Sequence, residues 1–169
     1  MNSSELKDFL DEKVLQYNTF DFIESDPVQI PHLFSLKEDI EIAGFLSATI
    51  AWGNRMMDLM GNAPFDFVMS HTENDLERLE TFVHRTFNGI DFASFIRSLQ
   101  HIYTNHGGLE TVFSKHQETN SMQKSIHEFK KIFFEIPHQY RTQKHISDPL
   151  NNSAAKRINI FMRLNKVVY

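Results

Sequence analysis

Lys156 is the residue in this sequence best placed to do chemistry. It follows a polar loop, in the stretch Ser153-Ala-Ala-Lys-Arg157, at the expected start of the last helix. The small neighbours allow another backbone to approach closely, and both the positive end of the helix and the guanidinium of Arg157 disfavour a charged amine. An amine that is not protonated is a nucleophile suited to Schiff-base formation. The competing interpretation is an ordinary exposed lysine on a basic helix.

The stretch Trp52-Gly53-Asn54-Arg55 is a second candidate surface. It follows residues 40–51, in which nearly every position is apolar. Gly53 is a natural helix stop, so an aromatic ring, an amide and a guanidinium emerge together where the core meets solvent. We therefore expect Trp52, Asn54 and Arg55 to form part of a binding surface.

Basic side chains gather in the last part of the chain. Residues 136–169 carry a net charge of +5, whereas the whole chain carries −5 and the remainder therefore −10. A basic segment on an acidic protein points to an anionic partner such as DNA, although a solvated basic helix has the same composition. The candidates for phosphate contacts are Arg141, Lys144, Arg157 and Arg163.

The histidines do not form a metal-binding motif. Nine are present, and no two of them are four residues apart, which is the spacing of zinc-binding helices. His101 and His106 are the closest pair, and five residues on one helix place two rings on different faces. There is no cysteine to supply a thiolate. The sequence thus predicts neither a metal site nor a cofactor.

A long apolar helix is expected to position these groups. The stretch from about Ser35 to Trp52 is apolar nearly all the way round, as in a helix that other helices surround. Ser35 and Glu38 have the spacing of a capping box at its start. Asp91 has the position of a cap for a later amphipathic helix, and Ser153 that of a cap for the last helix, from Ala154.

The whole chain reads as one helical domain. No stretch shows the period-two alternation of a strand, and residues 84–89 have the composition of a loop. Short helices separated by turns, with no heptad repeat that continues across a loop, are typical of an irregular orthogonal bundle. The fold class predicted for residues 1–169 is therefore all-α, with the other helices packed around a buried central one.

Composition also limits the setting of the protein. No apolar run is long enough to span a bilayer. The N-terminus lacks the basic and apolar regions of a secretory signal. We therefore expect a cytoplasmic protein with no membrane partner, and the sequence gives no indication of its oligomeric state.

Two parts of the sequence resemble a known family. The first is Glu38-Asp-Ile-Glu-Ile-Ala-Gly-Phe-Leu-Ser-Ala-Thr-Ile-Ala-Trp-Gly-Asn-Arg55. The second comprises His84-Arg-Thr-Phe-Asn88, Arg141-Thr-Gln-Lys-His-Ile-Ser147 and Ser153-Ala-Ala-Lys-Arg-Ile-Asn-Ile-Phe-Met-Arg163. They resemble a bacterial family of uncharacterised proteins, a domain of unknown function, over nearly the whole chain. That family is similar at a distance, over short stretches, to the helix-hairpin-helix DNA glycosylases.

The likeness to glycosylases implies a set of roles. In that superfamily a buried helix ends in polar residues that enter the DNA where a base is flipped out, which is the place of Trp52, Asn54 and Arg55. In its lyase members an early lysine of a later helix attacks the sugar C1′, which is the place of Lys156. The Gly-rich hairpin of that superfamily is replaced here by Asp148-Pro-Leu-Asn-Asn-Ser153. The aspartate that the mechanism requires is expected farther downstream.

The resemblance therefore also implies that the chain is incomplete at its C-terminus. Relatives are longer at a second place, directly after Arg55.

Three functions remain open. One is a DNA glycosylase or lyase in which Lys156 is the nucleophile, and the second is a non-catalytic nucleic-acid-binding module on the same scaffold. The third is a helical scaffold or interaction protein. The acidic body argues against broad non-specific DNA binding, because most domains that bind so are basic overall.

Overall fold

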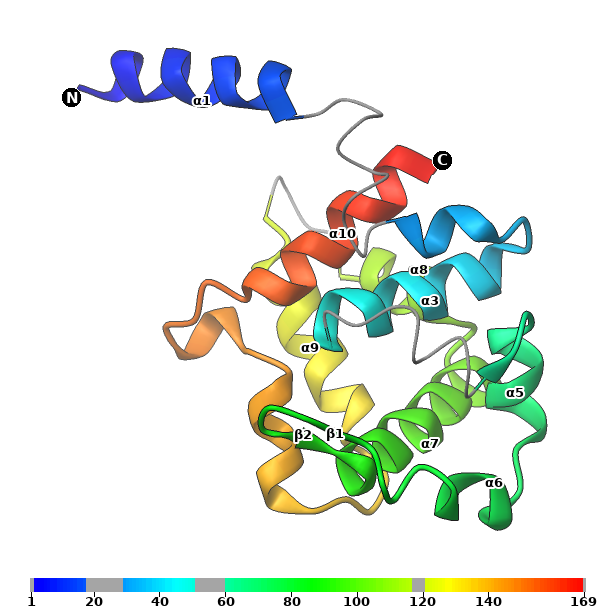
Figure 1. The fold of residues 1–169 in the computed structure, drawn as a ribbon. Coiled ribbons are helices and arrows are strands. Elements are labelled where there is room, and N and C mark those ends of the chain that lie inside the picture. The colour runs from blue at the N-terminus through cyan, green and yellow to red at the C-terminus, as the bar shows by residue number, and fades with distance from the viewer. Residues whose placement is uncertain (1, 18–28, 51–59, 117–120, 169) are drawn as a thin grey trace.

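The computed structural model is mainly helical over the residues that it describes (Figure 1). It describes residues 2–17, 29–50, 60–116 and 121–168. Within those residues the only sheet is a two-stranded hairpin, so the predicted all-α fold class is confirmed. The α-helices are α1 (Ser3–Tyr17), α3 (Lys37–Ile50), α5 (Pro64–Ser70), α6 (Glu73–Glu77), α7 (Gly89–Asn105), α8 (Leu109–Ser114), α9 (Gln123–Phe133) and α10 (Lys156–Val168). The 3-10 helices are η2 (Pro31–Leu33), η3 (Tyr140–His145) and η4 (Pro149–Asn151), and the strands are β1 (Val83–His84) and β2 (Phe87–Asn88).

Helix α3 is the buried centre of the bundle, as its apolar sequence predicts. From Asp39 to Ile50 every residue except Ala48 is buried. Helices α5 and α10 and the 3-10 helix η2 pack against it. A helix that is surrounded in this way needs apolar residues on every face, and this explains why its sequence shows no polar stripe.

The capping box predicted at the start of α3 is wrong by one residue. The helix begins at Lys37, and its first bond runs from the Ile40 amide to the Leu36 carbonyl (3.0 Å). Asp39 accepts a hydrogen bond from the Phe65 amide (2.8 Å) at the start of α5. The carboxylate therefore caps a neighbouring helix, a tertiary contact that local spacing does not predict.

Five phenylalanine rings meet at the middle of the bundle. The ring of Phe45 on α3 lies 5.9 Å from that of Phe95 on α7 and 5.6 Å from that of Phe161 on α10, between centroids. On α9, the rings of Phe129 and Phe133 lie 5.6 and 5.5 Å from it. Aromatic pairs at such distances contribute about 0.5–1.5 kcal/mol each beyond the area they bury. This cluster holds α7, α9 and α10 against the central helix.

A short hairpin leads into α7. Its strands pair Val83 with Asn88 and His84 with Phe87, although the sequence predicted a loop here. Strands of two residues are too short to show an alternating pattern. Helix α7 begins at Gly89 with Asn88 as its cap, so the predicted cap at Asp91 is wrong. Asp91 is the other half of a capping box, in which each side chain accepts from the other residue's amide (3.1 Å).

Helix α1 lies apart from the other helices in Figure 1. Its apolar side chains are exposed, with Leu6 at 42%, Phe9 at 48% and Leu10 at 51%. No helix in the described ranges, α1 included, is long and apolar enough to cross a bilayer.

Candidate functional site

Lys156 is the first residue of α10, and it is exposed. The predicted helix start at Ala154, with Ser153 as its cap, is wrong by two residues. The Ser153 hydroxyl accepts a hydrogen bond from the Ala155 amide (3.2 Å) and so stabilises a turn before the helix. The first helical bond runs from the Asn159 amide to the Ala155 carbonyl (3.0 Å). Lys156 consequently lies at the positive end of the α10 dipole.

Two residues in the left-handed region of backbone space precede Lys156. Asn152 has a φ of 59°, and Ala155 has a φ of 43°. Alanine in this region costs energy and persists only where the surrounding structure holds it there. Ala155 is 1% exposed, so packing holds it. The turn that presents Lys156 is therefore strained but fixed, a combination that is frequent at functional sites.

Asp148 lies at the other end of the loop that precedes Lys156. It accepts hydrogen bonds from the Leu150 amide (3.0 Å) and the Asn151 side chain (2.6 Å), and it lies 2.9 Å from Nδ1 of His127 on α9. Burial by itself would raise the pKa of Asp148, but His127 and the two other donors hold that pKa below its usual value. The ionised carboxylate thus ties η4, and the loop that follows, to α9.

Helices α3 and α10 pack against each other and run in opposite directions (Figure 1). Phe45 and Phe161 meet where they cross. From that contact, Ile50 is five residues toward the end of α3 and Lys156 is five residues toward the start of α10. At a rise of about 1.5 Å per residue, both displacements are about 7.5 Å. Lys156 therefore lies at the end of the helix pair where α3 ends.

Two of the predicted phosphate contacts lie near one buried histidine. Lys144 on η3 and Arg157 on α10 are both exposed. Burial lowers the pKa of His145, and the positive charges of Lys144 and Arg157 lower it further, whereas the negative charge of Asp91 acts in the opposite direction. Lys144 on η3 and Arg157 at the start of α10 therefore both lie near the His145 imidazole.

A third predicted phosphate contact, Arg141, is bound within the protein. Its guanidinium donates a hydrogen bond to the Thr86 carbonyl (3.0 Å) and lies 3.2 Å from the carboxylate of Asp91. The Arg141 side chain is 39% exposed, so it also reaches the surface. In the protein alone, Arg141 holds η3 against the hairpin and the start of α7.

Asp91 is the centre of a buried polar group that we call the Asp91 cluster. Its carboxylate is 0% exposed and accepts hydrogen bonds from the Thr142 hydroxyl (2.7 Å) and the Asn88 amide (3.1 Å). Arg141 contributes its charge, and Nε2 of His145 lies 3.3 Å away without the geometry of a hydrogen bond. The cluster joins η3 to α7 and thereby supports the surface that carries Lys144.

The remaining predicted contacts are placed differently. Trp52, Asn54 and Arg55 lie outside the described residues. Arg163 is exposed on α10, seven residues or about two turns after Lys156. The structure therefore places Lys156, Arg157 and Arg163 along α10 and Lys144 on η3, all of them exposed.

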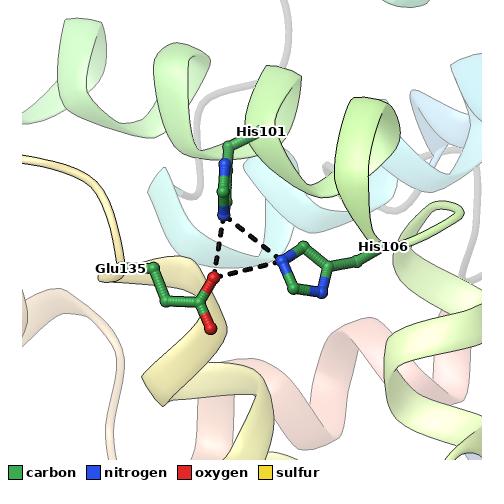
Figure 2. A group of neighbouring side chains, drawn as sticks. All are labelled: His101, His106 and Glu135. Atoms are coloured by element: carbon green, nitrogen blue, oxygen red, sulfur yellow. Dashed lines mark hydrogen bonds and ion pairs between the residues drawn. The ribbon is translucent and has the colours of Figure 1, made fainter.

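Sequence reasoning missed a second group, formed by His101, His106 and Glu135 (Figure 2). The prediction that the two histidine rings point away from each other is wrong, because α7 ends at Asn105. His106 is the C-cap, with a φ of −123° and a ψ of 2°, and Gly107 then turns the chain with a φ of 77°. Off the helix, the ring of His106 swings back toward His101. The signal was the Gly107-Gly108 pair, which marks a helix end directly beside His106.

The fold and the site define a class of protein, an all-α bundle with a basic surface and an exposed lysine at the start of its last helix. The family described as a protein of unknown function (DUF2400) matches residues 26–164, and the protein belongs to this family. This confirms the predicted relation to a domain of unknown function. The comparison with curated proteins and the comparison with solved structures each give no match.

Proposed function

We propose that the protein binds DNA and that Lys156 is the nucleophile of a base-excision-type glycosylase or lyase reaction. The observation that carries this proposal is the position of Lys156, exposed at the start of α10 where α3 ends. An amine at the surface can reach a nucleotide that has been flipped out of the duplex. The exposed charges of Lys144 and Arg157 are suited to bind phosphates of the DNA.

The reaction is simplest at an abasic site, where the sugar presents an aldehyde. Nζ of Lys156 adds to the aldehyde carbon C1′, and loss of one water leaves a Schiff base between protein and DNA. Borohydride delivers hydride to the carbon of this double bond and converts it into a stable amine. A covalent adduct that survives denaturing electrophoresis therefore reports the nucleophile directly.

The test is borohydride trapping of the full chain on a duplex that holds one abasic site. We expect an adduct with the unaltered protein and a loss of at least about 100-fold in Lys156→Ala, because the nucleophile itself is removed. Lys7→Ala is the matched control, since Lys7 is an exposed lysine on α1. It should give the same yield of adduct as the unaltered protein.

Two results would overturn the proposal. One is no adduct with the unaltered protein under conditions in which it binds the duplex. The other is an adduct of equal yield in Lys156→Ala, because this assigns the reaction to another amine. Circular dichroism of Lys156→Ala checks that the variant is folded, and we expect it to be, since Lys156 is exposed.

The second candidate function is non-catalytic nucleic-acid binding on the same surface. The exposure of Lys156 favours it, because lysine nucleophiles are commonly desolvated by an apolar pocket. This function predicts binding that weakens as salt rises, and Lys144→Ala and Arg157→Ala should each lower the logarithmic salt slope by about one. Affinity that does not change with salt excludes it.

A further inference from the structure

The second group, which we call the histidine–glutamate cluster, brings three ligand-type atoms together (Figure 2). Nε2 of His101 lies 2.9 Å from Oε2 of Glu135, and Nε2 of His106 lies 3.1 Å from the same oxygen. The two Nε2 atoms are 3.3 Å apart. The histidines come from the end of α7 and the glutamate from the turn after α9, so the fold, rather than local sequence, creates the convergence.

Hydrogen bonds alone do not account for the close approach of all three atoms. Each Nε2 holds either one proton or one lone pair in the plane of its ring, and an ionised carboxylate oxygen only accepts. If both Nε2 atoms carry a proton toward Glu135, two N–H groups face each other at 3.3 Å. If one of them is bare, its lone pair faces the carboxylate. At most two of the three contacts are therefore hydrogen bonds at any time.

A metal ion satisfies all three atoms at once. The point equidistant from atoms that are 2.9, 3.1 and 3.3 Å apart lies about 1.8 Å from each of them. Zinc binds imidazole nitrogen and carboxylate oxygen at about 2.0–2.2 Å, so an ion fits about 1 Å out of the plane of the three atoms. Two ligands of one tetrahedral zinc ion lie about 3.3 Å apart, close to the distances in this cluster.

Asn105 can orient one of the ligands from behind. Its side-chain amide lies 3.0 Å from Nδ1 of His101, on the side of the ring opposite Nε2. The atom that faces Nδ1 is Nδ2, which also donates to the His101 carbonyl (3.1 Å). Ligation through Nε2 places the remaining proton of His101 on Nδ1, so the Asn105 amide must then turn over to accept it through Oδ1. Outer partners of this kind fix the tautomer and the ring direction of histidines that bind metals.

The cluster is reachable from solvent. The side chains of His101 and His106 are 23% exposed, and that of Glu135 is 45% exposed. His101 also lines an open cleft of about 700 Å³ together with Arg97, Gln100 and Thr104. The hydrogen bond from His101, aided by His106, holds the pKa of Glu135 below its usual range, so the carboxylate is ionised at neutral pH.

We propose that His101, His106 and Glu135 bind one divalent transition-metal ion of the zinc type, with water as the fourth ligand. Two imidazoles and one carboxylate favour zinc over calcium and magnesium, which prefer oxygen ligands. Three protein ligands and one position open to water are the pattern of reactive zinc sites, whereas structural sites close all four positions. The ion ties the end of α7 to the turn after α9.

The test is calorimetric titration of the full chain with zinc chloride after treatment with EDTA. We expect one equivalent to bind, and we expect His101→Ala, His106→Ala and Glu135→Gln each to weaken binding at least about tenfold. His32→Ala is the matched control, because His32 is an exposed histidine on η2 outside the cluster. It should bind zinc as the unaltered protein does.

A second measurement does not depend on the folding of any variant. Cobalt(II) added to the unaltered protein should give the strong visible absorption of a tetrahedral site, and zinc should displace it. Weak absorption typical of octahedral cobalt overturns the proposal. Zinc binding that is unchanged in all three ligand variants, or weakened equally in His32→Ala, overturns it as well. These outcomes are independent of the reaction proposed for Lys156.

Discussion

Two clusters of histidine and carboxylate side chains in this protein place similar groups in opposite surroundings. In the Asp91 cluster the carboxylate is 0% exposed, and the Thr142 hydroxyl (2.7 Å), the Asn88 amide (3.1 Å) and the Arg141 guanidinium (3.2 Å) surround it. In the histidine–glutamate cluster the Glu135 side chain is 45% exposed, and two imidazole nitrogens face one of its oxygens.

The difference between the two clusters lies in what satisfies the carboxylate. A buried carboxylate surrounded by protein donors holds the fold together, because removing it leaves the buried partners without compensation. An exposed carboxylate that faces two imidazoles keeps its access to solvent and is open to a cation. The same residue types therefore stabilise the structure at one site and suit a ligand at the other. Four substitutions or conditions can break or sharpen this contrast.

The largest effect is expected for Asp91→Ala. This change leaves the Thr142 hydroxyl and the Asn88 amide without their acceptor, and each unsatisfied group costs about 1–3 kcal/mol, whereas Arg141 is 39% exposed and keeps access to water. The free energy of unfolding in urea measures it. Asp75→Ala is the matched control, because Asp75 has the same place in the capping box of α6 but faces solvent. If both variants lose the same small amount of unfolding free energy, the Asp91 cluster does not stabilise the fold.

A smaller effect is expected for Thr142→Val, which keeps the shape of the side chain and removes one donor to Asp91. The buried carboxylate then lacks the partner at 2.7 Å, and an unsatisfied buried acceptor costs about 1–3 kcal/mol. Thr104→Val, at an exposed position on α7, is the control. Urea unfolding of both variants decides the point, and equal stabilities would show that the hydroxyl contributes nothing.

The contrast between the clusters shows what the sequence does and does not predict. Apolar periodicity predicted the buried helix α3 and the all-α class, because burial of a whole helix face leaves a pattern along the chain. The cap positions were wrong at Ser35, Asp91 and Ser153. At α7 another polar residue, Asn88, is the cap. Helices α3 and α10 begin after Leu36 and Ala155, whose side chains cannot cap a helix, so local polar spacing did not locate their first residues.

The candidate sites also differ in how far local sequence predicts them. The position of Lys156 at the start of a helix followed from local sequence, within two residues. The meeting of His101 with Glu135 did not, because these residues are 34 positions apart and only the packing of α7 against α9 joins them. Local sequence did carry half of that site, since the helix stop at Gly107 frees His106 from the helix.

The pH dependence of stability tests the burial of His145 in the Asp91 cluster. Burial lowers the pKa of His145 in the folded protein from its usual 6.5. Below about pH 6.5 the unfolded chain therefore binds a proton that the folded protein does not bind, and the free energy of unfolding falls as pH falls. The slope from this one group is at most about 1.4 kcal/mol per pH unit.

Urea titrations between pH 7.5 and 5, on the unaltered protein and on His145→Leu, isolate this contribution, since the other groups titrate in both proteins. The variant should lose less stability over this range than the unaltered protein does. Equal slopes would mean that His145 takes up its proton as readily in the folded state as in the unfolded state. The contrast with the partly exposed histidines of the other cluster would then disappear.

The smallest effect is expected for His106→Ala in EDTA. The side chain is 23% exposed and lies in a turn after α7, so its removal should change the free energy of unfolding by less than about 1 kcal/mol. With zinc at about 100 times its dissociation constant the two proteins should separate, because an ion that binds only the folded state adds about 2.7 kcal/mol. If His106→Ala already loses much of its free energy of unfolding in EDTA, the histidine–glutamate cluster stabilises the fold without a metal, as the Asp91 cluster does. If zinc stabilises His106→Ala as much as it stabilises the unaltered protein, His106 is not a zinc ligand.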